Sequence, residues 1–235
     1  MTSISGNSGD IRATIFYFND LHANSTGAKR LKSASDEFDT VIKSQPDTDC
    51  FKFCAGDSYI GRNKSNFIGR FLNTLNLDGM ALGNHEMDMG TKQLSGFMDG
   101  NNFKVFTSNS DYKKGSNLQD DIDAGRLVKS SIIEKNGHKY GVIGATAADM
   151  LDTISIDSKE DCQDVEFLRF DASKKAIQTE VDKLKKQGIN KIILISHLGI
   201  ESDQKIAKET EGIVIIVGGH SHTTLDGVVD GQNYF

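Results

Sequence analysis

Residues 213–223 read IVIIVGGHSHT, which is an aliphatic run followed by two glycines and two histidines. A continuous aliphatic run that ends at glycine is typical of a strand buried on both faces of a parallel sheet. In open α/β sheets, ligands bind at the carboxyl ends of the strands, and His220 and His222 fall at such an end. The segment therefore predicts a buried strand that delivers two imidazoles to a functional site.

Four other short apolar runs end in the same way. The runs and the polar residues after them are 13–18 with Asp20 and His22, 50–55 with Asp57, 80–82 with Asn84 and His85, and 192–195 with His197. Five of the six histidines lie at these five ends, and the sixth, His138, is interpreted as an exposed hairpin residue. A single histidine is more often an ordinary residue than a ligand, but the coincidence at separate strand ends predicts one shared site.

Segments with helical spacing of apolar residues alternate with these runs. They cover 31–42, 67–75, 171–188 and 202–209, with Asp171 predicted to cap the third helix and Gly188 to end it. A further strand is predicted at 105–107, and strands at 127–133 and 139–145 join across Asn136-Gly137, a strong hairpin signal. The layout is mixed α/β, with parallel strands, helical crossovers and at least one antiparallel hairpin. The polar stretch 111–125 is expected to be a surface excursion.

The composition limits the classes of partner. With 37% hydrophobic residues and a net charge of −6, the chain can build a globular core but lacks the basic balance of a protein that binds polymeric nucleic acid. A small phosphorylated substrate is compatible with this charge, because bound cations can neutralise it. No run reaches the ~18 apolar residues of a membrane span. Residues 1–10 are expected to be flexible and show no signal peptide, which predicts a cytoplasmic protein if this start is native and an exported one if it is a trimmed fragment.

The chemistry of the residues at the strand ends fits a metal centre. Carboxylate, imidazole and amide oxygen without cysteine suit Zn²⁺, Mn²⁺ or Fe²⁺. Seven such ligands are too many for one ion and suit two, which a shared carboxylate would hold ~3.5–4 Å apart, the spacing that clamps a phosphoryl group. Glycines beside Asp57, Asn84 and His220 permit tight turns and close backbone approach.

The order of these motifs resembles the calcineurin-like metallophosphoesterase superfamily, and within it the branch of 5'-nucleotidases, 2',3'-cyclic nucleotide phosphodiesterases and UDP-sugar hydrolases. The motifs are GNHEMD at 83–88, SHLG at 196–199 and GGHSHT at 218–223, and the resemblance covers about residues 11–230. It implies a sandwich of two β-sheets flanked by helices. It also implies an enzyme that removes phosphate from nucleoside 5'-monophosphates or related nucleotides by attack of metal-bound hydroxide. Two alternatives stay open: a cyclic-nucleotide phosphodiesterase of the same fold, and a non-catalytic scaffold, which the complete ligand set disfavours.

The resemblance also assigns roles to single residues. One metal takes Asp20, His22, Asp57 and His222, and the other takes Asp57, Asn84, His197 and His220, so that Asp57 bridges. His85, beside the ligand Asn84, is implied to face the substrate and stabilise the transition state. Asp88 has two interpretations: it orients His85, or it caps the helix that follows.

Other residues near these motifs have less specific interpretations. Glu86 is expected to be a structural hydrogen-bonding residue and not a ligand. Arg62 and Lys64 either contact the substrate phosphate or belong to a solvated basic loop. Asn109 either lines the site or belongs to a turn.

The resemblance predicts more chain than is present here. Members usually continue past the last motif into further strands and a second domain that grips the nucleoside. Residues 227–235 look like the start of a hairpin whose return strand is missing. We therefore expect residues 11–235 to be a catalytic domain that lacks its last strands and a C-terminal substrate-binding domain.

Overall fold

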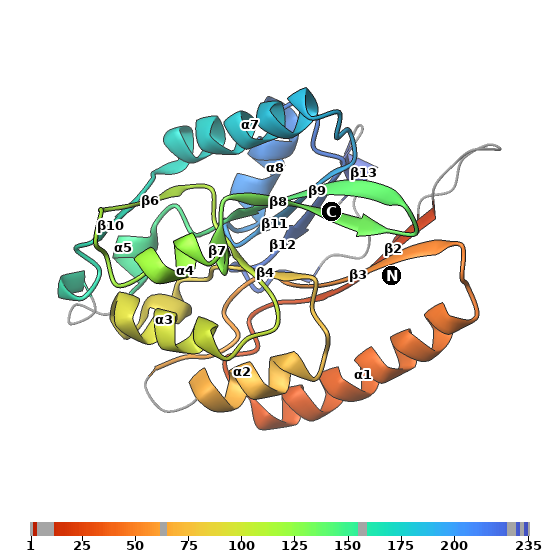
Figure 1. Ribbon diagram of the computed structural model, residues 1–235, viewed down its shortest axis with the longest axis horizontal. Helices are drawn as coiled ribbons and strands as arrows, with labels where there is room; N and C mark the ends of the chain where they lie inside the picture. The colour runs from red at the N-terminus through yellow and green to blue at the C-terminus, as the bar shows by residue number, and fades with distance from the viewer. Residues whose placement is uncertain are drawn as a thin grey trace.

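The computed structural model describes residues 12–61, 65–154 and 159–224, together with the backbone of three short strands near the termini. Within these residues, two six-stranded sheets lie face to face between two layers of helices (Figure 1). The predicted fold class, an α/β sandwich of two sheets flanked by helices, is confirmed. The prediction of a flexible start lies outside the described residues, apart from the backbone of Thr2–Ser3.

Parallel pairing organises the first sheet, whose strand order is β1-β2-β3-β4-β5-β7. All neighbours are parallel except β1, which pairs antiparallel with β2. The strands are β1 (Thr2–Ser3), β2 (Arg12–Phe18), β3 (Thr48–Cys54), β4 (Gly79–Ala81), β5 (Val105–Phe106) and β7 (Leu127–Val128). Helices α1 (Ser25–Lys43), α2 (Ser65–Asn73) and α3 (Gly90–Asp99) are crossovers between its strands; the periodicity predicts the first two, but no helix was predicted at α3.

The second sheet has the order β13-β14-β12-β11-β9-β8 and is also mainly parallel. Its strands are β8 (Ser130–Lys135), β9 (His138–Ala145), β11 (Ile192–Ser196), β12 (Ile215–Gly218), β13 (Val229–Asp230) and β14 (Asn233–Tyr234). Strands β8 and β9 form the predicted antiparallel hairpin, and α7 (Phe170–Lys186) and α8 (Ile200–Glu209) are its long helices. Among the described residues, no helix is both long and apolar enough to cross a bilayer.

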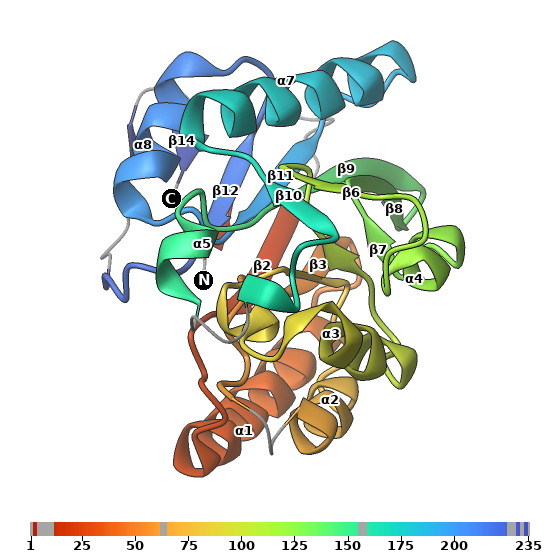
Figure 2. The same cartoon turned by 90° about the vertical axis from the view of Figure 1, so that its left-hand side faces the viewer.

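Successive side chains of the central strands enter different layers of the core, as Ile192 and Ile193 do on β11. The side chains between the two sheets form one buried cluster, which includes Ile15, Phe51, Phe53, Phe106, Val142, Ile193 and Val217. Two further clusters pack α1, α2 and α3 against the outer face of the first sheet, and α7 and α8 against that of the second (Figure 2). Because both faces of each sheet are covered, the central strands are almost continuously apolar, which is the pattern that the sequence shows.

The segment predicted as one strand at 127–133 is two strands in different sheets. Strand β7 pairs with β5 of the first sheet, whereas β8 pairs with β9 of the second, and the chain passes between the sheets at Lys129. Residues on both sides of Lys129 have the periodicity of a strand. The apolar pattern therefore does not indicate that the chain changes from one sheet to the other.

The interpretation of His138 as an exposed hairpin residue is wrong in part. Its side chain is 39% exposed, but Nδ1 lies 2.8 Å from Oδ2 of the buried Asp49 on β3. The hydroxyl of Tyr140 donates to the same oxygen over 2.5 Å. Asp49 therefore ties the β8–β9 hairpin of the second sheet to a strand of the first, a contact between residues about ninety positions apart in sequence that no local pattern reveals.

Three smaller expectations also differ from the structure. Asp171 does not cap α7, because the helix begins at Phe170 and its N-cap is Arg169. Asp171 lies in the first turn, where its carboxylate interacts favourably with the helix dipole. The excursion 111–125 contains ordered elements: β6 (Ser110–Tyr112) pairs with β10 (Val165–Phe167), and α4 (Gln119–Asp123) follows. The hairpin near the end has its return strand, since β13 and β14 pair antiparallel and β14 extends the second sheet beside β12.

Candidate active site and metal centre

All seven predicted ligands lie at the carboxyl ends of five strands, as the sequence predicts. Asp20 and His22 follow β2, Asp57 follows β3, Asn84 follows β4, His197 follows β11, and His220 and His222 follow β12. The strands end level with one another, since Phe18 pairs with Cys54 and Ser196 with Gly218. A hydrogen bond of 3.0 Å from the His220 amide to Asp20 Oδ2 links the two sheets at this edge. The sandwich therefore brings ligands from both sheets to one place.

Asp57 lies at the centre of this cluster. Its side chain is buried, and its Oδ2 is 3.1 Å from His197 Nε2 and 3.5 Å from His22 Nε2. Burial alone would raise the pKa of Asp57, but the hydrogen bond and charge of His197 and the His85 amide outweigh it and lower the pKa to about 2. The side chain is therefore a carboxylate at neutral pH, with histidines on two sides.

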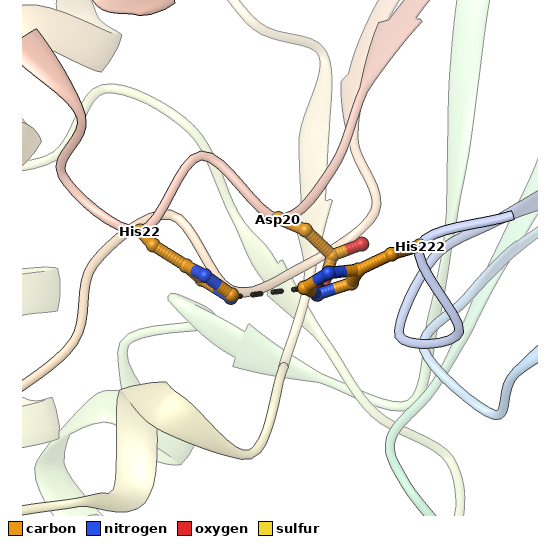
Figure 3. Close-up of side chains that lie close together, drawn as sticks. All are labelled: Asp20, His22 and His222. Carbon is orange, nitrogen blue, oxygen red and sulfur yellow. Dashed lines mark ion pairs between the residues drawn. The ribbon is translucent and has the colours of Figure 1, made fainter. Parts of the chain in front are cut away.

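The first group of candidate ligands is Asp20, His22 and His222. Figure 3 shows the Asp20 carboxylate beside the two imidazoles, which approach it from opposite sides. Asp20 Oδ1 is 3.3 Å from His222 Nε2 and 3.9 Å from His22 Nε2. Asp20 Oδ1 and His22 Nε2 are buried atoms without a hydrogen-bond partner. Buried polar atoms are almost always satisfied, so two unpartnered atoms facing each other fit a cation site.

The second group is Asp57, His197 and His220, with Asn84 beside them. Asn84 Oδ1 lies 3.3 Å from His197 Nε2 and 3.1 Å from His220 Nδ1. His197 is fully buried between two acceptors, because its Nδ1 donates to Ala55 O over 2.6 Å. Burial lowers its pKa, but Asp57 outweighs this and raises it to about 9. A divalent cation here would take the place of the Nε2 proton, as metal binding to histidine requires.

The backbone at the site is strained. In the described part of the chain, eight non-glycine residues have positive φ, and five of them are predicted ligands: Asp20, His22, Asp57, His220 and His222. Such conformations cost about 1–3 kcal/mol each and persist where the surrounding structure enforces them, which is typical of functional sites. Asp and His tolerate this region better than branched residues do, so the ligands fit these turns.

Glycine and Glu86 allow the β3 and β4 ends to meet. A Cβ on Gly83 would lie 2.2 Å from Asp57 Oδ1 and 2.3 Å from Asp57 N, so the two loops approach more closely than any other residue permits. Glu86 is fully buried and accepts hydrogen bonds of 2.8–2.9 Å from the amides of Asp57, Ser58 and Gly83 and from the Ser58 hydroxyl. Burial raises the pKa of Glu86 to about 7, against these donors. The expected structural role of Glu86 agrees with this geometry.

Replacement of Glu86 by glutamine should destabilise the protein although it preserves the shape of the side chain. In either amide orientation, an NH₂ group faces backbone N–H donors that Glu86 now satisfies. Each unsatisfied buried group costs about 1–3 kcal/mol, so we expect Glu86→Gln to lower the free energy of unfolding by roughly 2–5 kcal/mol. Urea denaturation measures the change, with the exposed Glu134→Gln as the control. An unchanged midpoint in Glu86→Gln would contradict this role.

His85 and Asp88 form a pair at the mouth of the site. His85 Nδ1 lies 2.8 Å from Asp88 Oδ2, while His85 Nε2 is 4.0 Å from Asp57 Oδ2 and its ring packs edge-on against His22. The hydrogen bond to Asp88 raises the pKa of His85. Helix α3 has its N-cap at Met89, one residue after Asp88. The geometry favours the orienting interpretation of Asp88 over the capping one.

The remaining candidates are distributed as follows. Arg62 and Lys64 lie outside the described residues. Asn109 does not line the site: it is fully buried, and its amide donates to Thr146 O and Ser173 Oγ, which joins the end of β5 to neighbouring segments. Asp149 was missed; its Oδ1 is 3.5 Å from His220 Nε2. It follows β9, so the strand-end rule applied to residues 139–145 would have found it.

A groove of about 840 Å³ opens beside His22 and His222. Its wall includes Asn24, at the start of α1, and Phe67, whose side chain is 65% exposed. The groove has the size of pockets that hold small ligands and leads directly to the first group of candidate metal ligands.

Comparison with known proteins agrees with this site. The family model described as calcineurin-like phosphoesterase matches residues 13–224. The chain is 31% identical to a 5'-nucleotidase of Diplobatis ommata over 94% of this chain and 39% of that protein. It is 30% identical to a probable 5'-nucleotidase of Treponema pallidum, over 92% and 38% of the respective chains.

Solved structures of nucleotidases are also similar to this chain. A 5'-nucleotidase precursor from Thermus thermophilus superposes with a TM-score of 0.75 and 28% identity, over 93% of this chain and 43% of that one. The NAD nucleotidase of Haemophilus influenzae gives a TM-score of 0.74 and 25% identity, over 88% and 38%. The chain therefore spans less than half of the length of these relatives.

Proposed function

Because this chain belongs to the calcineurin-like phosphoesterase family, we propose that it is a metal-dependent phosphohydrolase that acts on nucleoside 5'-monophosphates or related nucleotides. The observation that carries the proposal is the set of candidate ligand groups linked by His22 and Asp57, with unpartnered buried atoms on Asp20 and His22. The 5'-nucleotidases among the relatives support the substrate class.

The centre has ligands for two divalent ions. We assign one to Asp20, His22, Asp57 and His222, and the other to Asp57, Asn84, His197 and His220. Zn²⁺, Mn²⁺ and Fe²⁺ suit this mixture of carboxylate, imidazole and amide oxygen. When bound, such ions polarise the phosphoryl oxygens and activate a water molecule.

The other residues of the site bind and orient the substrate. Asp88 holds Nδ1 of His85, so Nε2 of the same ring points into the centre toward Asp57. The raised pKa of His85 favours the form that carries a proton on Nε2. This Nε2–H group can donate a hydrogen bond to the phosphoryl group or to the departing oxygen, where negative charge develops. Asn84, whose Oδ1 lies within 3.3 Å of His197 Nε2 and His220 Nδ1, is a further candidate for contact with the substrate.

Phosphate release tests the function directly. The chain is stripped with a chelator, then assayed with and without Mn²⁺ or Zn²⁺ on nucleoside 5'-monophosphates, p-nitrophenyl phosphate, bis-p-nitrophenyl phosphate and 2',3'-cyclic nucleotides. We expect metal-dependent hydrolysis of the monoesters. Preference for the diesters and cyclic nucleotides would favour the phosphodiesterase alternative. Absence of hydrolysis in a metal-loaded, folded sample would favour the non-catalytic scaffold.

A further inference from the structure

The two nitrogens of the His220 imidazole face different surroundings. One faces the candidate metal ligands, and the other faces the carboxylate of Asp149. Nδ1 of His220 faces Asn84 Oδ1 at 3.1 Å, toward Asp57 and His197. Nε2 faces Asp149 Oδ1 at 3.5 Å. The two ring nitrogens therefore face a candidate metal ligand and a half-exposed carboxylate, respectively.

Asp149 is not used for the local role that its position would suggest. It is the N-cap residue of α5 (Met150–Thr153), where an aspartate side chain ordinarily accepts a hydrogen bond from the first turn of the helix. Here its side chain makes no capping hydrogen bond. The carboxylate lies beside His220 instead, with Oδ1 3.5 Å from Nε2.

We propose that Asp149 is a positioning residue for His220, an inference that rests on the proposed metal centre. Its carboxylate accepts the Nε2 proton and so keeps the lone pair of Nδ1 directed at the position shared by Asn84, His197 and Asp57. Metal-binding histidines generally donate their second N–H to a carboxylate or a carbonyl, which fixes the tautomer and the ring orientation. The proposed hydrogen bond requires the half-exposed Asp149 side chain to move closer than its present 3.5 Å separation from Nε2.

His197 shows how the same requirement is met elsewhere in the centre. Its second nitrogen, Nδ1, donates to the backbone carbonyl of Ala55 over 2.6 Å, inside the core. That acceptor cannot be changed by substitution of a side chain. His220 depends on a side chain at the surface, so its orientation can be tested without disturbing the core.

Mn²⁺ binding to the chelator-stripped chain tests this role, measured by titration calorimetry and electron paramagnetic resonance. We expect Asp149→Asn to lower the affinity for one of the two Mn²⁺ ions by about 10–100-fold and to leave the affinity for the other unchanged. Asp149→Glu should restore most of the affinity. Glu134→Gln is the control, because Glu134 is an exposed carboxylate on β8 of the same sheet. In a His220→Ala background, Asp149→Asn should have no further effect.

Exchange of the His220 Nε2 proton provides a second readout. In ¹⁵N-labelled protein loaded with Zn²⁺, we expect the Nε2–H signal to be protected from solvent exchange in the wild type and to exchange faster in Asp149→Asn. Unchanged Mn²⁺ affinity in Asp149→Asn would overturn the role, and so would equal weakening of both ions. If the wild type binds no Mn²⁺, the proposed metal centre and this role fall together. If it binds two but exchange of the Nε2 proton does not depend on Asp149, this role falls alone.

Discussion

Asp57→Ala should release both metal ions at once and lower kcat/KM by at least about 10⁴-fold. Asp57 belongs to the second group of candidate ligands and also reaches the first, since its Oδ2 lies 3.1 Å from His197 Nε2 and 3.5 Å from His22 Nε2. Metal ions supply several kcal/mol of transition-state stabilisation, and about 1.4 kcal/mol corresponds to a factor of ten in rate. Metal content after dialysis and steady-state kinetics on p-nitrophenyl phosphate measure the two effects.

His222→Ala is the matched control for this prediction. His222 belongs to one group of candidate ligands, and its side chain is 59% exposed. Its loss should therefore lower the affinity for one ion and preserve the fold. Retention of one tightly bound ion by Asp57→Ala, with the same content as His222→Ala, would contradict a bridging role for Asp57.

His85→Ala should keep the metal content of the wild type and lower kcat by about 10²–10⁴-fold, the range for a positioned acid or electrostatic group. His85 points its Nε2 into the centre while Nδ1 is held by Asp88 at 2.8 Å. Its neighbour Asn84 faces the two histidines of the second group, so the two adjacent side chains have separate roles.

Asp88→Asn separates orientation from chemistry in the same site. We expect a smaller fall in kcat than in His85→Ala, because the imidazole remains but loses the carboxylate that holds it. A His85→Ala protein that loses metal together with activity would show that His85 is a ligand and would contradict its catalytic assignment.

The strand-end rule accounts for how much of the site the sequence could predict. Each ligand follows a short apolar run, and parallel pairing brings the ends of those runs level, as in the pairing of Ser196 with Gly218. The rule needs no knowledge of side-chain geometry, so it identifies the residues that meet at this edge, and their roles as ligands stay a prediction. It was not applied to the hairpin strand β9, which is why Asp149 was missed.

Other features depend on contacts that local sequence does not encode. The passage from β7 to β8 changes sheets within a stretch of uniform strand periodicity. The contact of His138 with Asp49 joins the two sheets, and it appears only when they pack. The positive φ of Asp20, His22 and Asp57 arises because the loops must turn their side chains inward against a local preference. The C-terminal substrate-binding domain stays a prediction.

Anomalous diffraction from crystals soaked in Mn²⁺ or Zn²⁺ tests the metal centre most directly. We predict two anomalous peaks per chain, about 3.5–4 Å apart, with the Asp57 carboxylate between them. One peak should lie beside Asp20, His22 and His222, and the other beside Asn84, His197 and His220. A well-ordered crystal with a single peak, or with no peak at the ends of these strands after soaking, would contradict a two-metal phosphohydrolase.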